Sequence, residues 1–205
     1  MIDLYYAPTG NGLRAAVALE ECALPFNRHK VDLMKGEQKT PEFLKMNPAG
    51  AIPVMIESDG PGGKPLTLVQ SGAILLYAAE KSGRFIPKDP LRRAVAWQWF
   101  MQATSDTAGA GAMIFQMTSQ FAEKSPAIQQ FVEARFIKTV SVCDQRLAER
   151  EYLADEFSIA DLALYPAIAG RRALLEKAGD LKNLLRWADQ IGARPAVQRG
   201  MQPPA

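Results

Sequence analysis

The sequence has little of the chemistry that most catalytic and metal sites use. Among its 205 residues, His29 is the one histidine, and Cys22 and Cys143 are the two cysteines. A structural zinc site needs clustered Cys and His ligands, and a serine-type triad needs a histidine beside its nucleophile. The two cysteines form no CxxC pair. We therefore expect no metal site and no histidine-based triad, and we expect Cys22 to be buried as a small apolar side chain.

Strong charge and long apolar runs are also lacking. The 24 Lys and Arg residues nearly balance the 22 Asp and Glu residues, for a net charge of +2. That balance favours neither nucleic acid nor a membrane surface as a partner. No apolar run approaches the ~18 residues of a spanning helix, and the start lacks the basic-then-apolar pattern of a signal peptide. We expect a globular, cytoplasmic protein.

The first 82 residues alternate between strand-like and helix-like patterns. Ile2, Leu4 and Tyr6 have the period-2 spacing of a strand, and a helical pattern follows from Gly12 to Cys22. Further along come a strand at 26–32, a short helix at 41–46, strands at 51–57 and 66–69, and a helix at 71–82 that Ser71 is placed to cap and Gly83 to end. The predicted order is β-α-β-α-β-β-α.

From Pro90 onward only helical patterns occur. Trp97, Phe100 and Met101 recur at helical spacing, and a second such run covers 128–147. The predicted fold class is α/β plus all-α. We expect an α/β domain at 1–82, a linker at 83–90 and an all-helical domain at 91–205.

Three short motifs stand at element boundaries. Pro53 cannot donate a ladder hydrogen bond, so Ile52-Pro53 is either a cis bond exposing the Ile52 backbone to a ligand or a trans proline on an edge strand. Ser71 either caps its helix or helps the helix N–H groups to bind a carboxylate or phosphate. Ser158 and Asp161 have capping-box spacing, which we interpret as a folding signal rather than a catalytic pair.

These motifs, in this order, resemble the glutathione transferase superfamily over essentially the whole chain. The matching segments are NPAGAIPVM, VQSGAILLYAAEK, SIADLALYP and WADQIGARPAVQ. The opening MIDLYYAPTGNG, the stretch KGEQKTPEFLKMNP and the PGGKP insertion look most like the nu-class branch, bacterial proteins that bind glutathione or its disulfide and reduce disulfide bonds. The resemblance implies a thioredoxin-like N-terminal domain, a homodimer, and glutathione, as thiol or disulfide, in place of any metal.

The resemblance also implies how the tripeptide is held. Ile52 is expected to bond the cysteinyl backbone of glutathione in a strand-like manner, with Pro53 cis. Gln70 and Ser71 are expected to hold the γ-glutamyl end, with the Ser71 hydroxyl and N–H on its carboxylate. Gln38 matches a family position that reaches the bound tripeptide.

Three further positions complete the implied site. Thr9 and Asn11 face the sulfur, and Arg135 matches an arginine of the helical half that reaches glutathione, in some relatives from the partner subunit. The chain also departs from the family pattern twice. Many relatives have Glu where Gln70 stands, so a charge-assisted contact to the glutathione amino group is weakened. Some have a basic residue where Ala51 stands, so one candidate partner for the glycyl carboxylate is missing.

The opening turn offers no nucleophile of its own, but glutathione carries a thiol. Loop N–H groups, the Thr9 hydroxyl, the Asn11 amide and the start of the first helix are placed to stabilise a thiolate. One such contact is worth about 1.5–3 kcal/mol, which lowers a thiol pKa by roughly one to two units. Tyr5 and Tyr6 are alternative activators, although the alternation of Tyr6 with apolar residues favours core packing.

The predicted function is a glutathione-dependent thiol-disulfide oxidoreductase. The first alternative is a glutathione transferase or peroxidase acting on a small electrophile or hydroperoxide. Its second substrate would lie in the helical half, unless the apolar residues there are core: Met101, Met113, Phe115, Met117 and Phe121. The second alternative is a non-catalytic interaction protein on the same fold, against which the retained site residues argue.

Overall fold

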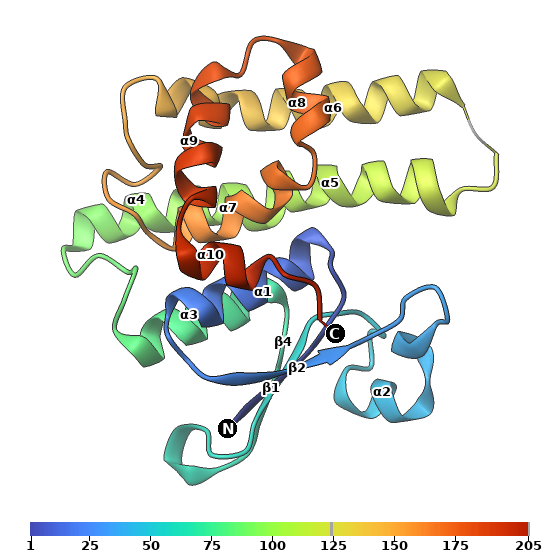
Figure 1. Ribbon diagram of the computed structural model, residues 1–205, viewed down its shortest axis with the longest axis vertical. Coiled ribbons are helices and arrows are strands. Elements are labelled where there is room, and N and C mark those ends of the chain that lie inside the picture. The colour runs from blue at the N-terminus through green and yellow to red at the C-terminus, as the bar shows by residue number, and fades with distance from the viewer. Residues whose placement is uncertain (124, 205) are drawn as a thin grey trace. The chain divides into compact units, whose positions relative to one another are not determined.

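The computed structural model describes residues 1–123 and 125–204, which form two compact units (Figure 1). The first unit comprises Met1–Arg84 together with the segment from Ala193 onward, and the second comprises Phe85–Gly192.

The first unit is built on a four-stranded mixed sheet in the order β2-β1-β3-β4. Its strands are β1 (Ile2–Tyr6), β2 (Phe26–Lys30), β3 (Val54–Glu57) and β4 (Leu66–Val69). Its helices are α1 (Gly10–Glu21), α2 (Pro41–Met46), α3 (Ser71–Ser82) and α10 (Pro195–Gly200), with single 3-10 turns η1 (Glu37–Lys39) and η2 (Pro61–Gly63). The predicted order β-α-β-α-β-β-α is confirmed.

The two faces of the sheet carry alternate residues of each strand. Leu4 and Met55 pair across β1 and β3 and are fully buried on the face that α1 and α3 cover (Figure 1). Tyr5 and Val54 pair one residue further along and pack on the other face, where Phe43 of α2 completes the core. The sheet is therefore covered by helices on both faces.

Helix α1 begins at Gly10, two residues before the predicted start at Gly12. Thr9 is the N-cap residue, and its hydroxyl oxygen accepts a hydrogen bond from the Gly12 N–H at 3.2 Å. A Cβ on Gly12 would lie 2.1 Å from the carbonyl oxygen of Ala7. Gly12 is therefore required by the close approach of the helix to the end of β1, and the predicted start was wrong because glycine was interpreted as a turn residue.

The segment from Ala193 packs on α1, whereas the predicted division assigned it to the helical domain. Arg194 forms a two-point ion pair with Glu21, with N–O distances of 2.7 and 2.8 Å. A Cβ on Gly200 would lie 2.5 Å from the Cα of Val17, so the two backbones almost touch. A helical period does not indicate which unit a helix packs on. Here the contacts of this segment with α1, among them the Arg194–Glu21 ion pair, place it in the first unit.

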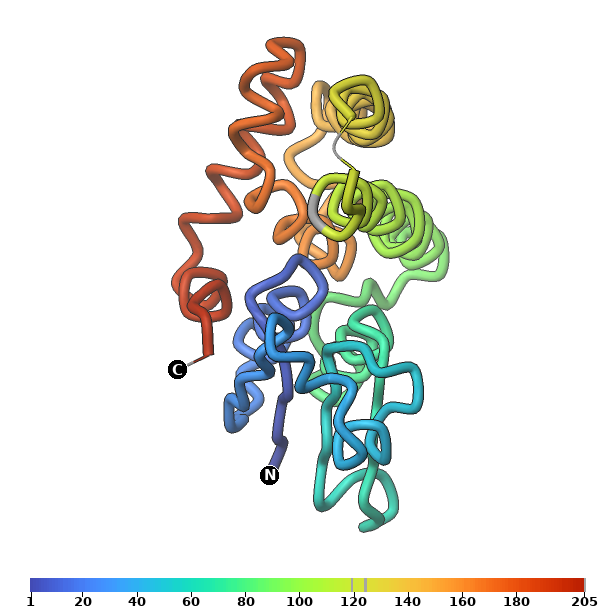
Figure 2. Tube along the Cα trace, turned by 90° about the vertical axis from the view of Figure 1, so that its right-hand side faces the viewer, coloured from blue at the N-terminus to red at the C-terminus, as the bar shows by residue number. Residues whose placement is uncertain are grey.

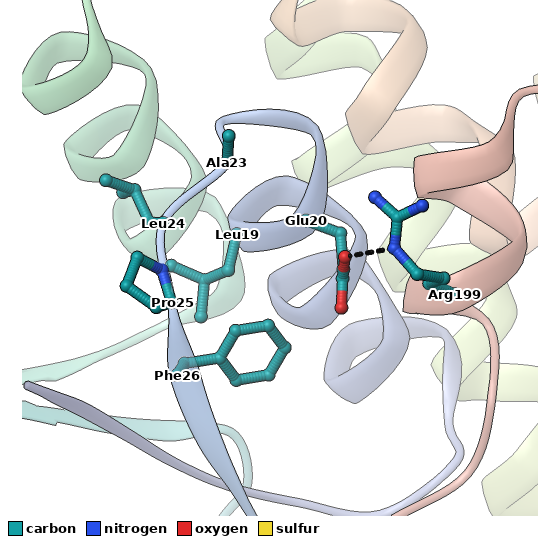
Figure 3. Close-up of a pocket in the computed structure, with 7 residues that line it drawn as sticks. All are labelled: Leu19, Glu20, Ala23, Leu24, Pro25, Phe26 and Arg199. Carbon is teal, nitrogen blue, oxygen red and sulfur yellow. Dashed lines mark hydrogen bonds and ion pairs between the residues drawn. The ribbon is translucent and has the colours of Figure 1, made fainter.

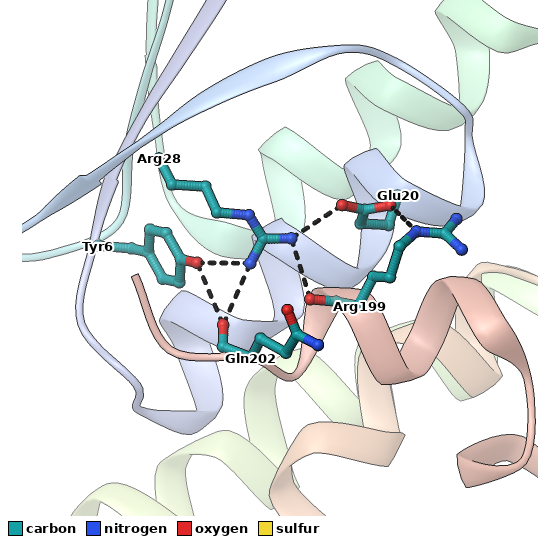
Figure 4. A network of polar contacts seen from close by, with 5 residues as sticks. All are labelled: Tyr6, Glu20, Arg28, Arg199 and Gln202. Carbon is teal, nitrogen blue, oxygen red and sulfur yellow. Dashed lines mark hydrogen bonds and ion pairs between the residues drawn. The ribbon is translucent and has the colours of Figure 1, made fainter. Parts of the chain in front are cut away.

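A polar network holds the same segment to the sheet (Figure 4). The Arg28 guanidinium donates to the Tyr6 hydroxyl, to the backbone carbonyls of Arg199 and Gln202, and to the Glu20 carboxylate. Glu20 also pairs with the Arg199 side chain at 2.8 Å. Tyr6 is fully buried, as its alternation predicted, and burial raises the pKa of its hydroxyl. The Tyr6 hydroxyl thus has a structural role.

The second unit is helical, as predicted. Its helices are α4 (Pro90–Met101), α5 (Ala108–Phe115), α6 (Pro126–Leu147), α7 (Ile159–Ala169), α8 (Arg172–Ala178) and α9 (Lys182–Gly192). Two π-helical turns, η3 (Gln102–Thr107) and η4 (Gln116–Gln120), continue α4 into α5 and extend α5. Helices α5 and α6 run side by side (Figure 2). None of the helices in the described part of the chain is both long and apolar enough to cross a membrane.

The capping box at the start of α7 is confirmed, and it extends further than predicted. The Ser158 hydroxyl accepts from the Ala160 N–H, and the Asp161 carboxylate accepts from the Ser158 N–H at 3.0 Å. Asp161 also accepts from the Leu153 N–H at 3.2 Å and from the Trp187 indole N–H at 2.9 Å. One fully buried carboxylate therefore joins α7, the preceding loop and α9.

Candidate functional site

The strand directions bring most of the predicted site to one edge of the sheet. Strands β1 and β4 both run antiparallel to β3, and Tyr5, Val54 and Val69 lie in one row across them. Strand β2 is parallel to β1 and ends at the same edge. The segments after β1, β2 and β4 and the segment before β3 therefore meet there. They carry seven of the predicted site residues: Thr9, Asn11, Gln38, Ile52, Pro53, Gln70 and Ser71.

Arg14, which no sequence motif indicated, links two of these segments. Its Nη1 donates to the Asn11 side-chain oxygen at 2.7 Å and to the Ser71 hydroxyl at 2.8 Å. Arg14 is only 1% exposed, and burial lowers the pKa of its guanidinium to about 10, so it remains charged at neutral pH. The available signal was an arginine within the apolar run of α1, because a buried charge requires partners.

Ser71 does not cap α3, so that part of the prediction was wrong. It is the first residue of the helix, 7% exposed, and its hydroxyl accepts from Arg14. Gln70 occupies the N-cap position with φ 72° and ψ 114°, and its side chain makes no capping hydrogen bond. A non-glycine residue at positive φ is costly, and such strain is often found where a site needs a particular backbone direction.

Thr9 and Asn11 stand at the start of α1. The Thr9 hydroxyl oxygen is used to cap the helix, which leaves its proton able to donate. Asn11 is exposed, and Arg14 holds its amide oxygen. The first N–H groups of α1 lie beside both side chains and carry partial positive charge. This end of α1 is suited to an anion.

The Ile52-Pro53 peptide bond is cis, as the family resemblance implied. Pro53 is buried, and Ile52 packs against the core cluster of Phe43 and Val54. The residue before this pair is also held in place, because the Asn47 side chain donates to the Ala51 carbonyl at 2.6 Å.

Gln38 carries an unsatisfied polar atom. Its side-chain oxygen Oε1 is buried and has no hydrogen-bond partner in the described part of the chain. Gly50, two residues before Ile52, lies against the Gln38 backbone, where a Cβ would be 3.0 Å from the Gln38 carbonyl oxygen. A buried acceptor without a donor is costly, so this position is suited to an N–H group of a ligand.

Arg135 belongs to the second unit, whereas the other predicted site residues belong to the first. Its side chain is exposed on α6, and its backbone carbonyl accepts from the Thr139 hydroxyl. Its contact with a ligand stays a prediction.

The other reactive side chains singled out in the sequence have structural environments. The Tyr5 ring stacks on His29 with centroids 4.4 Å apart. Cys22 and Cys143 are free and buried, and burial raises the pKa of both thiols, that of Cys143 to about 12. Among the residues described, no group of three or more His, Cys, Asp or Glu is placed to hold a metal ion.

A hollow of about 340 Å³ lies at the C-terminal end of α1, away from Thr9 and Asn11 at its start (Figure 3). It is lined by Leu19, Glu20, Ala23, Leu24, Pro25, Phe26 and Arg199. Glu20 and Arg199 pair with each other across it. The hollow offers an apolar wall and a neutralised ion pair, and none of the predicted site residues lines it.

Comparison with known proteins agrees with this architecture. Residues 2–80 match the model of the glutathione S-transferase N-terminal domain. Over 98% of its length the chain is 38% identical to the disulfide-bond oxidoreductase YfcG of Escherichia coli (strain K12), 94% of which is covered. The chain belongs to the glutathione S-transferase family. The expectations of a thioredoxin-like domain followed by a helical domain, and of an enzyme of this superfamily, are confirmed.

Two further relatives extend the comparison. Glutathione S-transferase F10 of Arabidopsis thaliana is 32% identical over 96% of the chain and 94% of its own length. The crystal structure of a glutathione transferase from Pseudomonas putida, with one glutathione disulfide bound per subunit, superposes with a TM-score of 0.91. It is 32% identical in sequence, and the match covers all of this chain and 92% of that one.

Proposed function

We propose that this glutathione S-transferase family member binds glutathione at the sheet edge and uses its thiolate to reduce disulfides. The observation that carries the proposal is the meeting of Asn11 and Ser71 on the buried Arg14, at the N-termini of α1 and α3. Two helix N-termini and a buried cation form an environment that favours anions. Glutathione supplies carboxylates and, when ionised, a thiolate.

The proposed pose follows the residues along the edge. The cysteinyl backbone lies against Ile52, and the γ-glutamyl carboxylate meets Ser71 at the start of α3. The unsatisfied Gln38 oxygen takes an N–H of the tripeptide. The sulfur then lies at the start of α1, where Asn11 and Thr9 supply donors.

The chemistry needs no protein nucleophile. The glutathione thiolate attacks one sulfur of a disulfide R–S–S–R, forming a glutathione mixed disulfide and releasing one thiolate, which takes up a proton. A second glutathione thiolate attacks the glutathione sulfur of the mixed disulfide, forming glutathione disulfide and releasing the second thiol. Two glutathione molecules are oxidised by two electrons in total, and one disulfide is reduced to two thiols.

The choice of disulfides rests on the 38% identity to a protein named as a disulfide-bond oxidoreductase. The direct test is a side-by-side assay of a small disulfide, a chloronitroarene and a hydroperoxide, each with glutathione. We expect the disulfide to give the highest kcat/KM. A higher value for either other substrate would contradict the proposed reaction, and no glutathione-induced rise in melting temperature would contradict glutathione binding itself.

A transferase or peroxidase is the second candidate, and one observation in the helical unit favours it. Met101, Phe115 and Phe121 are 56%, 48% and 51% exposed, so these apolar side chains are not core of that unit. Met113 and Met117 are half-buried. Exposed apolar side chains suit an apolar second substrate. The chloronitroarene and hydroperoxide assays test this candidate.

The family resemblance also implies a homodimer in the cytoplasm, and we propose both. A reducing compartment suits a reaction that consumes free thiol. Light scattering during size-exclusion chromatography should give twice the mass of one 22.5 kDa chain. Capture on immobilised glutathione tests the remaining alternative, an interaction protein without glutathione binding, which would not be retained.

Removing both cysteines should leave disulfide reduction largely unchanged. Cys22 and Cys143 are buried with raised thiol pKa values, so neither forms thiolate near neutral pH. We expect the Cys22→Ala, Cys143→Ala double variant to lose about 1 kcal/mol of stability per site. Turnover and a thermal melt measure the two effects, and a folded variant without activity would show that a protein thiol takes part.

Replacing Gln38 with leucine should separate stability from binding. Removing the unsatisfied oxygen should stabilise the ligand-free protein by about 1 kcal/mol, while losing one hydrogen bond to glutathione should weaken binding about ten-fold. Melting curves and calorimetric titration measure these effects. Gln198→Leu, at an exposed position of the same unit, is the matched control. Glutathione binding unchanged in Gln38→Leu would remove Gln38 from the site.

A further inference from the structure

Arg14 imposes an orientation on the two side chains that it holds. A guanidinium has donors and no acceptor, so any atom bonded to it must accept. The Asn11 atom facing Arg14 is therefore the amide oxygen, and the amide NH₂ group points away from the guanidinium. The Ser71 oxygen likewise accepts, so its proton is available to another partner. Both bonds come from the same nitrogen, Nη1, which fixes the two side chains relative to each other.

We infer that Arg14 is a positioning residue that turns the Asn11 amide and the Ser71 hydroxyl into two donors directed at one bound glutathione. The Asn11 NH₂ group donates to the sulfur, and the Ser71 hydroxyl donates to the γ-glutamyl carboxylate. The inference rests on the proposed function, which supplies the ligand. It adds the reason why an asparagine, whose amide has a donor end and an acceptor end, is able to stabilise an anion here.

The positive charge of Arg14 acts in the same direction. Burial brings the pKa of Arg14 to about 10, so Arg14 stays charged from pH 5 to pH 9. The acidic and titratable side chains of the elements packed on α1 have partners of their own or are exposed. The residues that form ion pairs are Asp3 with His29, Glu20 with Arg28 and Arg199, Glu21 with Arg194, and Lys81 with Glu57. Two tyrosines are hydrogen-bonded, Tyr6 to Arg28 and Tyr77 to Glu57. Tyr5 stacks on His29, and Glu80 is exposed.

Arg14→Met tests the inference, because methionine fills much of the space without charge or donors. Thiolate absorbs ultraviolet light more strongly than thiol, so a pH titration of the enzyme with bound glutathione reports the pKa of its thiol. We expect that pKa to rise by about one unit in Arg14→Met. The pH profile of kcat/KM for disulfide reduction should shift in the same direction, and KM for glutathione should rise. Arg14→Lys, which keeps a charge and donors on a shorter side chain, should shift the pKa less.

Arg28→Met is the matched control. Arg28 makes several hydrogen bonds in the same unit but none to Asn11 or Ser71, so its loss should lower the melting temperature and leave the thiol pKa unchanged. A folded Arg14→Met variant that binds glutathione with an unchanged thiol pKa would overturn the inference. If the wild-type enzyme binds no glutathione, the proposed function fails instead.

A crystal structure of the wild-type enzyme with glutathione gives a second test that does not depend on how a variant folds. The inference requires the Asn11 side-chain nitrogen within hydrogen-bond distance of the sulfur, with its oxygen still on Arg14. A sulfur that contacts only Thr9 or backbone N–H groups would contradict it.

Discussion

Asn11→Ala is expected to lower glutathione-dependent disulfide reduction by about ten-fold or more, a loss of about 1.4 kcal/mol in transition-state stabilisation. The Asn11 amide stands at the start of α1 with its oxygen held by Arg14, so its NH₂ group is the donor available to a bound sulfur. Alanine removes that donor, raises the pKa of the bound thiol and reduces the thiolate fraction at neutral pH. Initial rates at saturating glutathione, with a thermal melt, measure this effect.

Asn11→Asp separates catalysis from folding at the same position. A carboxylate accepts from Arg14 as the amide oxygen does, so this variant should fold at least as stably as the wild type. It offers no donor and places a negative charge beside the sulfur, which disfavours thiolate. We therefore expect turnover lower than in Asn11→Ala. Wild-type turnover in both variants would assign activation of the thiol to Thr9 or to the backbone N–H groups of α1.

Asp161→Ala is expected to destabilise the helical unit by about 4 kcal/mol, because four buried donors lose their acceptor at about 1–3 kcal/mol each. The donors are the backbone N–H groups of Leu153 and Ser158, the Ser158 hydroxyl and the indole N–H of Trp187. Asp161 is fully buried, so water cannot take the place of the carboxylate without opening the structure. Urea unfolding followed by tryptophan fluorescence measures the loss.

Two single variants apportion that effect. Ser158→Ala removes the capping hydroxyl and should cost about 1 kcal/mol. Trp187→Phe removes one donor to Asp161 and leaves the two backbone N–H groups bonded. If Asp161→Ala lowers the free energy of unfolding no more than Ser158→Ala does, the contacts of the carboxylate with the preceding loop and α9 do not contribute to stability.

The pH dependence of the same variant has a definite sign. Burial raises the pKa of the Asp161 carboxyl from 3.8 to about 6. Between these values the folded protein binds a proton that the unfolded chain has released, so the stability contributed by Asp161 is full below pH 3.8 and falls as pH rises through 6. The difference in unfolding free energy between wild type and Asp161→Ala should therefore be larger near pH 4 than at pH 7, by up to about 3 kcal/mol. A difference that grows with pH would contradict the raised pKa.

The sequence alone determined the features that depend on neighbouring residues. Period-2 and period-3.6 patterns indicated the strands and helices of the first 82 residues in the correct order, and the helical character of the residues that follow. The capping box was recognised because Ser158 and Asp161 are three residues apart, and a helix start is a local structure. The resemblance to the glutathione transferase superfamily rests on motifs of this local kind, and it correctly implied the cis Ile52-Pro53 bond.

The tertiary structure decided the features that depend on residues far apart in the chain. Ser71 was expected to cap α3, but it accepts from Arg14, 57 residues earlier. The C-terminal segment was expected in the helical domain, but Arg194 pairs with Glu21, 173 residues earlier. Local propensity contains no information on such pairings, because their energy arises only once the chain has brought both side chains into one buried place. The role of the buried Arg14 was likewise apparent only in the tertiary structure, because it depends on the hydrogen bond to the distant Ser71.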